Sequence, residues 1–271
     1  MRGGHVKKRI ALIYGGEGRE RSISLLSARG VIKLLDPERY DLIPVFISHT
    51  GSWYIGSNDP LGAMPTAGAT PTFPVMLHGS SGFLVSGGIM RIDAALPILH
   101  GDLGEDGVIQ GVLSAAHIPY VGCDVISSAA CADKGYTKAV AASIGIKTAK
   151  WTVEYSRSDT AKAKAIKRAE ESISYPMFIK PARLGSSIGA RPVMCRRDLE
   201  VAYTAADKYG AGVLIEELIP VSAEIECAYL ESGEEKLFCA DGVVRTSGAA
   251  YSFREKYVDI WLMRMSIIRW K

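Results

Sequence analysis

Cysteine pairs, histidine pairs and long apolar runs are all missing from this sequence of 271 residues. Its five cysteines are scattered and never form a CxxC pair, which argues against a disulfide framework or a zinc knuckle and favours a reducing cytoplasm. The five histidines show neither HExxH nor paired spacing, so we do not expect a histidine-ligated metal. No stretch approaches the roughly 18 apolar residues that would span a bilayer. The sequence therefore predicts neither a membrane-spanning protein nor a secreted disulfide scaffold.

A strong excess of one charge is also lacking. Lysine and arginine number 32 against 29 acidic residues, and the formal net charge of +3 is too small to indicate a nucleic-acid or membrane partner. The hydrophobic content of 48% is sufficient for a substantial core, and the length favours about two domains.

Three familiar nucleotide-binding signatures are absent. The GxGxxG fingerprint fails because "GGEGRER" has Arg21 in place of the third glycine, and the next strand ends without the acidic residue that would hold a ribose. The sequence contains no GxxxxGK[ST], and it also lacks the HRD and DFG elements of protein kinases. We therefore do not expect a nicotinamide dehydrogenase, a P-loop NTPase or a protein kinase.

The first half of the chain alternates strands and helices. Residues 9–47 are typical of one β-α-β unit, and residues 92–122 of a second that ends in the strand "IPYVG". This alternation predicts a parallel sheet, with "GGEGRER" and "HGDLGEDG" beyond the carboxyl ends of its strands, where ligands bind. Apolar residues at helical spacing predict the buried faces of the two helices; they are Ile23, Leu26, Val31, Leu34 and Leu35, then Val108, Val112, Leu113 and Ala116.

The second half is typical of an α+β arrangement. It predicts one helix over 129–145, further helices over 160–172 and 197–210, and strands near 147–155 and over 212–219. The segments 223–231 and 235–244 are predicted to pair as antiparallel strands.

The segment "KPARLGSSIG", residues 180–189, lies between the predicted helices over 160–172 and 197–210. We interpret it as a flap between two strands. Its small residues leave backbone N–H groups uncovered, and Lys180 and Arg183 add positive charge, a combination that suits a phosphate chain. An ordinary polar hairpin loop is the alternative, and the flap taken alone does not decide between them.

These segments together resemble D-alanine:D-alanine ligases of the ATP-grasp superfamily. The resemblance is carried by "GGEGRERSIS", "HGDLGEDGVIQG", "DKGYTK", "KPARLGSSIG", "VLIEELI…AEIECA" and "SFREKY", in the family's order and spacing. It implies an α/β plus α+β protein, in which a Rossmann-like N-terminal parallel sheet precedes an ATP-grasp fold that is incomplete at its C-terminus. The implied domains are an N-terminal domain over 1–122, a central ATP-grasp lid over 123–213 and a partial C-terminal ATP-grasp domain over 214–271.

The resemblance also implies an activity. The family joins two D-alanines with ATP through an acyl phosphate, makes D-alanyl-D-alanine for peptidoglycan precursors, and uses Mg²⁺ or Mn²⁺. Tyr257 stands in a loop pattern that favours an amine nucleophile, D-alanine first and D-serine as the alternative. A cytoplasmic homodimer with small-molecule substrates is expected.

Most of the residues that match the family's nucleotide-binding positions are lysines and glutamates. In the family, lysines at these positions bind phosphates, a flap serine belongs to the nucleotide-binding set, and the glutamate segment holds the adenine and ribose. In this sequence they are Lys134, Lys180 and Lys256, then Ser187, then Glu216, Glu217 to Ile219, and Glu224. The alternative for Lys134 is a solvated helix residue, and for each glutamate an exposed strand carboxylate.

Four residues match the family's substrate positions. Glu20 corresponds to the carboxylate that holds the ammonium of the first D-alanine, and His100 to a histidine on the substrate side. Ser186 corresponds to a flap serine that, with Tyr257 and Glu20, links two loops over the substrate. A first-turn helix charge is the alternative for Glu20, and a satisfied polar residue at a strand end for His100.

The sequence departs from the family after Tyr257. Relatives carry there an arginine and the ligands of two magnesium ions, whereas here "VDIWLMRMSIIRWK" offers only Asp259 as a carboxylate side chain, so no metal ligand is assigned. A shifted reading frame or a truncation is the interpretation, and we expect the chain as written to release little phosphate. A non-catalytic nucleotide-binding remnant is therefore the second candidate function. Leu184 is a smaller departure, at a position that is acidic in many relatives.

Overall fold

The computed structural model describes residues 6–55, 70–74, 81–220, 224–238, 242–244 and 266–267. The chain forms two compact units, 1–137 and 138–271, and the division falls inside one helix. Within the described ranges, no helix combines the length and the apolar character needed to cross a membrane.

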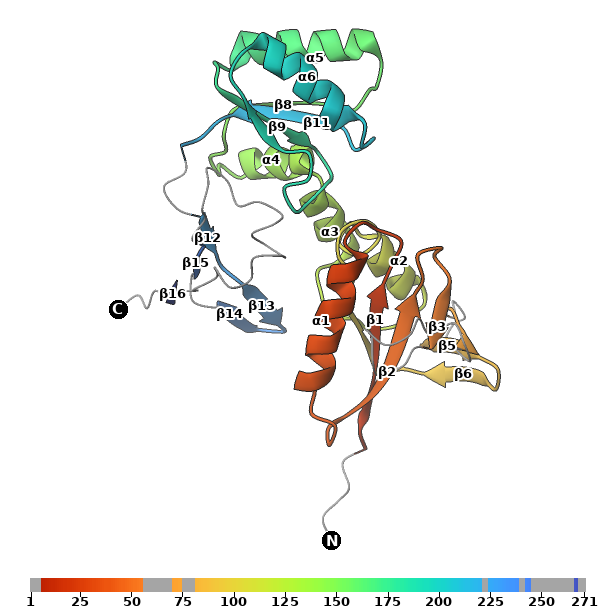
Figure 1. Ribbon diagram of the computed structural model, residues 1–271. Helices are drawn as coiled ribbons and strands as arrows, with labels where there is room; N and C mark the ends of the chain where they lie inside the picture. The colour runs from red at the N-terminus through yellow and green to blue at the C-terminus, as the bar shows by residue number, and fades with distance from the viewer. Residues whose placement is uncertain are drawn as a thin grey trace. The chain divides into compact units, whose positions relative to one another are not determined.

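The first unit contains a five-stranded sheet with the order β4-β3-β2-β1-β7, of which Figure 1 labels β1, β2 and β3. β1 runs parallel to both β2 and β7, as the alternation of strands and helices predicts, whereas β3 and β4 add antiparallel strands at one edge. The bounds are β1 Lys8–Gly15, α1 Arg21–Leu34, β2 Tyr40–Ile47, β3 Trp53–Ile55, β4 Thr70–Pro71, β5 Gly82–Val85, β6 Gly88–Arg91, β7 Ala94–Pro97 and α2 Val108–Ala115.

Both faces of this sheet are buried. Alternate residues of β1 point to opposite sides, so Leu12 packs with Ala28 of α1 and Ile13 packs in the cluster that contains Leu113 of α2. A central parallel strand covered on both faces needs a continuous apolar run, which "IALIY" supplies.

The predicted apolar faces of the two helices are partly wrong. Leu26, Leu34 and Val108 are exposed, whereas Ser24 and Ala28 of α1 are the buried residues of that helix. Small residues let α1 approach the sheet closely, and the larger leucines beside them lie on the solvent side.

The predicted strand "IPYVG" is wrong as well. Tyr120 makes only an isolated bridge to Ala95, with Ala95 N–H donating to the carbonyl of Pro119 and Val121 N–H donating to that of Ala95. Proline cannot donate to a ladder, and Gly122 at φ 137° turns the chain away two residues later.

One predicted helix over 129–145 proves to be two, α3 (Val125–Ala132) and α4 (Lys134–Ser143). Asp133 between them has extended backbone angles, and its carboxylate accepts the N–H groups of Gly135 and Tyr136. An aspartate that caps the next helix in this way is favoured at a helix N-terminus, which explains the break.

The second unit contains an antiparallel sheet with the order β10-β9-β11-β8. Its elements are β8 Trp151–Glu154, α5 Asp159–Ser172, β9 Met177–Pro181, β10 Arg191–Val193, α6 Arg196–Asp207 and β11 Val213–Glu217. β11 pairs with both β8 and β9. The predicted domain boundary at 213/214 therefore falls inside a strand of this sheet.

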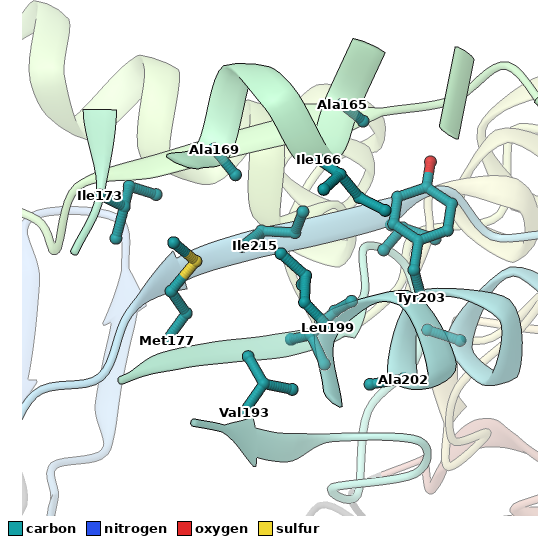
Figure 2. Packing of buried hydrophobic residues seen from close by; sticks show 13 residues of the cluster. Ala165, Ile166, Ala169, Ile173, Met177, Val193, Leu199, Ala202, Tyr203 and Ile215 are labelled. Atoms are coloured by element: carbon teal, nitrogen blue, oxygen red, sulfur yellow. The ribbon is translucent and has the colours of Figure 1, made fainter. Parts of the chain in front are cut away.

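One face of this sheet packs against α5 and α6 (Figure 2). Ile179 and Ile215 point into this core, where Ile166 and Leu199 meet them from the two helices. Burying one such side chain contributes roughly 1.5–3 kcal/mol to stability. Because neighbours along a strand alternate, Lys180 and Glu216 point to the opposite face.

The remaining described strands are β12 Glu224–Glu226, β13 Tyr229–Ser232, β14 Glu235–Phe238, β15 Gly242–Val244 and β16 Ser266–Ile267. β12 pairs with β15 and β13 with β14, both antiparallel, which confirms the pairing predicted for these segments.

Candidate functional site

In the first unit, the loops at the carboxyl ends of β1 and β7 are joined by Ser24. Its buried hydroxyl accepts the N–H of Gly15 at 2.9 Å and donates to the carbonyl of Ile98. These bonds fix the first turns of α1 against two strand ends, where an α/β sheet binds ligands.

Glu20 is the N-cap residue of α1, but its side chain makes no capping hydrogen bond. The carboxylate lies instead against Gly101, so closely that a Cβ at position 101 would clash with its Oε2. Gly101 also has φ 66°, a left-handed conformation that favours glycine. The structure thus places the predicted ammonium-binding carboxylate beside the loop that follows His100.

His100 lies between two polar groups. Its Nε2 is 3.0 Å from Ser27 Oγ, and its Nδ1 is 3.6 Å from Glu105 Oε1. Glu105 also accepts the N–H of Gly101 at 3.0 Å through Oε2. The hydrogen bond with His100 is the main cause that holds the pKa of Glu105 below its ordinary value. Desolvation raises this pKa, and the hydrogen bond from the Gly101 N–H lowers it. His100 and Glu105 therefore brace the loop on which the Glu20 carboxylate rests.

This arrangement predicts a pH-dependent contribution from Glu105. Its side chain is 60% exposed, so Glu105→Gln should lower the free energy of unfolding at pH 7 by less than about 1 kcal/mol. A lowered pKa means that the unfolded chain binds the proton more readily. The difference in free energy of unfolding between the two proteins should thus be complete above pH 4.5, the ordinary pKa of a glutamate carboxyl. It should vanish as the pH falls through the lowered pKa of the folded protein. Urea unfolding at successively lower pH checks this, and a difference that does not change with pH would contradict it.

In the second unit, the flap is a hairpin loop between β9 and β10, as predicted. Ser186, Ser187 and Gly189 all have left-handed backbone angles, with φ of 52°, 59° and 71°. Ile188 N–H donates to the carbonyl of Gly185 at 3.1 Å, which closes a tight turn at the tip. Non-glycine residues in this conformation are uncommon and cluster at sites that hold ligands.

At the base of the flap, Lys180 forms an ion pair with Glu216. Lys180 Nζ lies 2.5 Å from Glu216 Oε1, and Lys138 Nζ from α4 lies 2.8 Å from Oε2. Lys180 pairs across the strands with Leu214, so it stands diagonally opposite Glu216 on the same face of the sheet. A carboxylate and two ammonium groups thus share a face of the sheet opposite the α5–α6 core.

The segment after Glu216 continues beyond the end of β11. Glu217 N–H donates to the carbonyl of Lys150 at 2.9 Å, and Leu218 N–H donates to the carbonyl of Pro176 at 3.4 Å. Ile219 is half exposed. These bonds hold the segment that follows the inner strand β11, the position predicted to read an adenine.

The other predicted residues are less closely placed. Lys134 begins α4 and belongs to the first unit, and Glu224 lies in β12, where only its backbone is described. Lys256 and Tyr257 fall outside the described residues. The structure therefore brings Lys180 and Glu216 together in one unit, and Glu20 and the His100 loop in the other.

Within the described part of the chain, no three His, Cys, Asp or Glu side chains gather closely enough to hold a metal ion. The described residues therefore do not provide the oxygen cage that magnesium requires.

The sequence interpretation missed Lys138, Glu105 and Gly101. A signal for Lys138 existed, because Lys134 and Lys138 are four residues apart in "KGYTK" and lie on one face of a helix. No local pattern indicated that the partner of Lys138 would be Glu216, on a strand far along the chain.

Family profiles and curated proteins match most of this chain. Profiles described as "D-ala D-ala ligase N-terminus" and "D-ala D-ala ligase C-terminus" match residues 9–123 and 140–268. D-alanine--D-alanine ligase of Bifidobacterium longum subsp. infantis is 36% identical, with 93% of this chain and 77% of that protein covered. The enzyme of the same name from Caldicellulosiruptor bescii is 37% identical over 93% and 71%.

Solved structures are similar too. The VanG D-Ala:D-Ser ligase from Enterococcus faecalis has a TM-score of 0.81 at 32% identity, covering 93% of this chain and 74% of that one. The D-alanine-D-alanine ligase from Coxiella burnetii has a TM-score of 0.75 at 29% identity, covering 88% and 71%. The chain therefore belongs to the D-alanine:D-alanine ligase family of ATP-grasp proteins.

Proposed function

We propose that this protein is an ATP-dependent ligase that joins two D-alanines into D-alanyl-D-alanine, a building block of peptidoglycan precursors. The observation that carries the proposal is the glycine-serine flap with an ion-paired lysine, Lys180, at its base. Membership of the family supports the proposal. The Glu20 carboxylate beside Gly101 supports it as well, because it is a candidate to bind the substrate's ammonium group.

The reaction has two steps. The carboxylate of the first D-alanine attacks the γ-phosphorus of ATP, which forms an acyl phosphate and releases ADP. The amine of the second D-alanine then attacks the acyl carbon and expels inorganic phosphate, so that one amide bond is made for each ATP cleaved. The protein must neutralise phosphate charge, place two small zwitterions and exclude water.

The described residues can meet these needs as follows. Lys180 binds phosphate together with backbone N–H groups at Ser186 and Ser187. Glu216 and the segment to Ile219 hold the adenine. Glu20 binds the ammonium of the first D-alanine, and His100 stands on the same side.

The remaining assignments rest on the matched family positions alone. Lys134 and Lys256 bind phosphates, Glu224 binds the ribose, and Tyr257 joins Ser186 and Glu20 over the substrate. The family's reaction uses Mg²⁺, with Mn²⁺ as a substitute, to neutralise the phosphates. A cytoplasmic homodimer is the corresponding assembly.

D-serine is the alternative second substrate, because the VanG structure, a D-Ala:D-Ser ligase by its title, is similar to this chain. The two nucleophiles differ by one hydroxyl group, and an apolar pocket rejects such an addition only weakly. Competition between D-alanine and D-serine therefore decides the second substrate.

The decisive experiment mixes the chain with ATP, Mg²⁺ and D-alanine and follows ADP and dipeptide formation. If the ligase proposal holds, D-alanyl-D-alanine forms, L-alanine gives no product, and a mixed dipeptide appears only when D-serine competes successfully. The departure from the family after Tyr257 predicts the opposite outcome, little phosphate release. ATP binding without any dipeptide would contradict the ligase proposal and favour a nucleotide-binding remnant.

A further inference from the structure

The buried carboxylate of Glu216 is held by two lysines. Each carboxylate oxygen forms an ion pair with one ammonium group: Oε1 lies 2.5 Å from Lys180 Nζ, and Oε2 lies 2.8 Å from Lys138 Nζ. The side chains are 11%, 22% and 14% exposed for Glu216, Lys180 and Lys138 respectively. The two lysines therefore supply one positive charge more than is required to neutralise the Glu216 carboxylate.

A second cation matters because a buried carboxylate is costly to leave unpaired. If Lys180 were the sole partner of Glu216, its movement to a phosphate would leave that carboxylate uncompensated close to another anion. With Lys138 in place, one lysine can leave while the other keeps the carboxylate paired.

The position of the two lysines indicates which one leaves. Lys180 lies on β9, one residue from the end of the strand that leads into the flap, and it is the more exposed of the two. Lys138 comes from α4, and its side chain is more deeply covered. Lys180 is therefore the cation that can reach a ligand under the flap.

We propose that Lys138 is a positioning residue of the nucleotide site, which holds Glu216 in place while Lys180 moves to the phosphates of ATP. This inference rests on the proposed function, because it takes ATP as the ligand of Lys180. Lys138 itself touches no phosphate in this scheme and acts through Glu216.

The test measures how much the phosphates contribute to binding. Isothermal titration of the chain with ATP and with adenosine gives two dissociation constants, and their ratio reports on phosphate contacts alone. In Lys138→Met, Lys180 must stay on Glu216, and the ratio of adenosine Kd to ATP Kd should fall about tenfold. Lys138→Arg keeps the charge and should retain the ratio.

A double variant gives the rescue. In Lys138→Met with Glu216→Gln, position 216 no longer needs a cation, so Lys180 is released and the ratio should recover. Adenosine affinity is followed separately, because Glu216 is also assigned to the adenine. An unchanged ratio in Lys138→Met, or no recovery in the double variant, would overturn the inference.

Two further comparisons keep the test decisive. If Lys138→Met does not fold, Glu216→Gln is compared with the double variant. Equal ratios support a positioning role, whereas a lower ratio in the double variant shows that Lys138 binds phosphate directly and overturns it. Absence of ATP binding by the unmodified chain would contradict the proposed function, whereas ATP binding with an unaltered ratio contradicts this inference alone.

Discussion

Replacing Lys180 with methionine should weaken ATP binding by about 10- to 100-fold, which corresponds to roughly 1.5–3 kcal/mol for a hydrogen bond to a charged group. Methionine keeps much of the length of the side chain and removes the ammonium. Adenosine, which has no phosphates, should bind the variant as well as it binds the unmodified chain.

The fold should survive this change. Glu216 keeps Lys138 at 2.8 Å after the loss of Lys180, so no buried carboxylate is left unpaired. The core on the other face of the sheet is untouched, because Ile179 and Ile215 point away from Lys180. We therefore expect the unfolding temperature to change little.

Lys167→Met is the matched control. Lys167 is an exposed lysine of α5 that pairs with Glu171 one turn away, and α5 packs on the opposite face of the sheet. The control removes the same charge from the same unit and should leave ATP affinity unaltered. Equal losses in the two variants would show that overall charge, not a contact at Lys180, governs binding.

Much of the fold could be predicted because its signals are local. The apolar run of β1 and the small residues of the flap depend on neighbours in sequence, and both elements lie where the sequence places them. The break between α3 and α4 is local too, but it depends on Asp133 turning its carboxylate to cap α4, and a helical pattern continues through that position.

The exposed leucines of α1 show a different limit. Leu26 and Leu34 have the spacing of a buried face, yet the helix rotates so that Ser24 and Ala28 meet the sheet. Ser24 bonds to the ends of β1 and β7, and that rotation is therefore set by tertiary hydrogen bonds. Periodicity alone carries no information about them.

The candidate site was predicted through matched family positions, and what was missed is pairing over long range. The ion pair between Lys138 and Glu216 joins a helix to a strand, and the contact between Glu20 and Gly101 joins two loops. Neither arrangement follows from spacing, because each depends on how separate segments pack.

The contact between Glu20 and Gly101 leads to a second large effect. Gly101→Ala should weaken binding of D-alanine at least tenfold while leaving ATP binding intact. The new Cβ would clash with Glu20 Oε2, and the cheapest response is for that flexible side chain to move from its position. A displaced carboxylate loses its geometry toward an ammonium group, which depends on distance and direction.

Glu20→Gln is the companion variant. It keeps the shape of the side chain but removes the charge, and it should weaken D-alanine binding by a similar factor, on the order of 1.5–3 kcal/mol. If Gly101 acts through Glu20, the two changes together should cost little more than either alone. A fully additive loss would show that Gly101 acts by another route.

Gly51→Ala is a closely matched control for Gly101→Ala. Gly51 has φ 77° beside 66° at Gly101, and a Cβ at position 51 would clash with Oε1 of Glu17, also a carboxylate oxygen. Both substitutions thus introduce the same backbone strain and displace a glutamate in the same unit, but only one displaces Glu20. Equilibrium dialysis with labelled D-alanine, and titration with ATP, should show the loss in Gly101→Ala alone. Equal losses in both would mean that backbone strain, rather than the position of the Glu20 carboxylate, controls substrate binding.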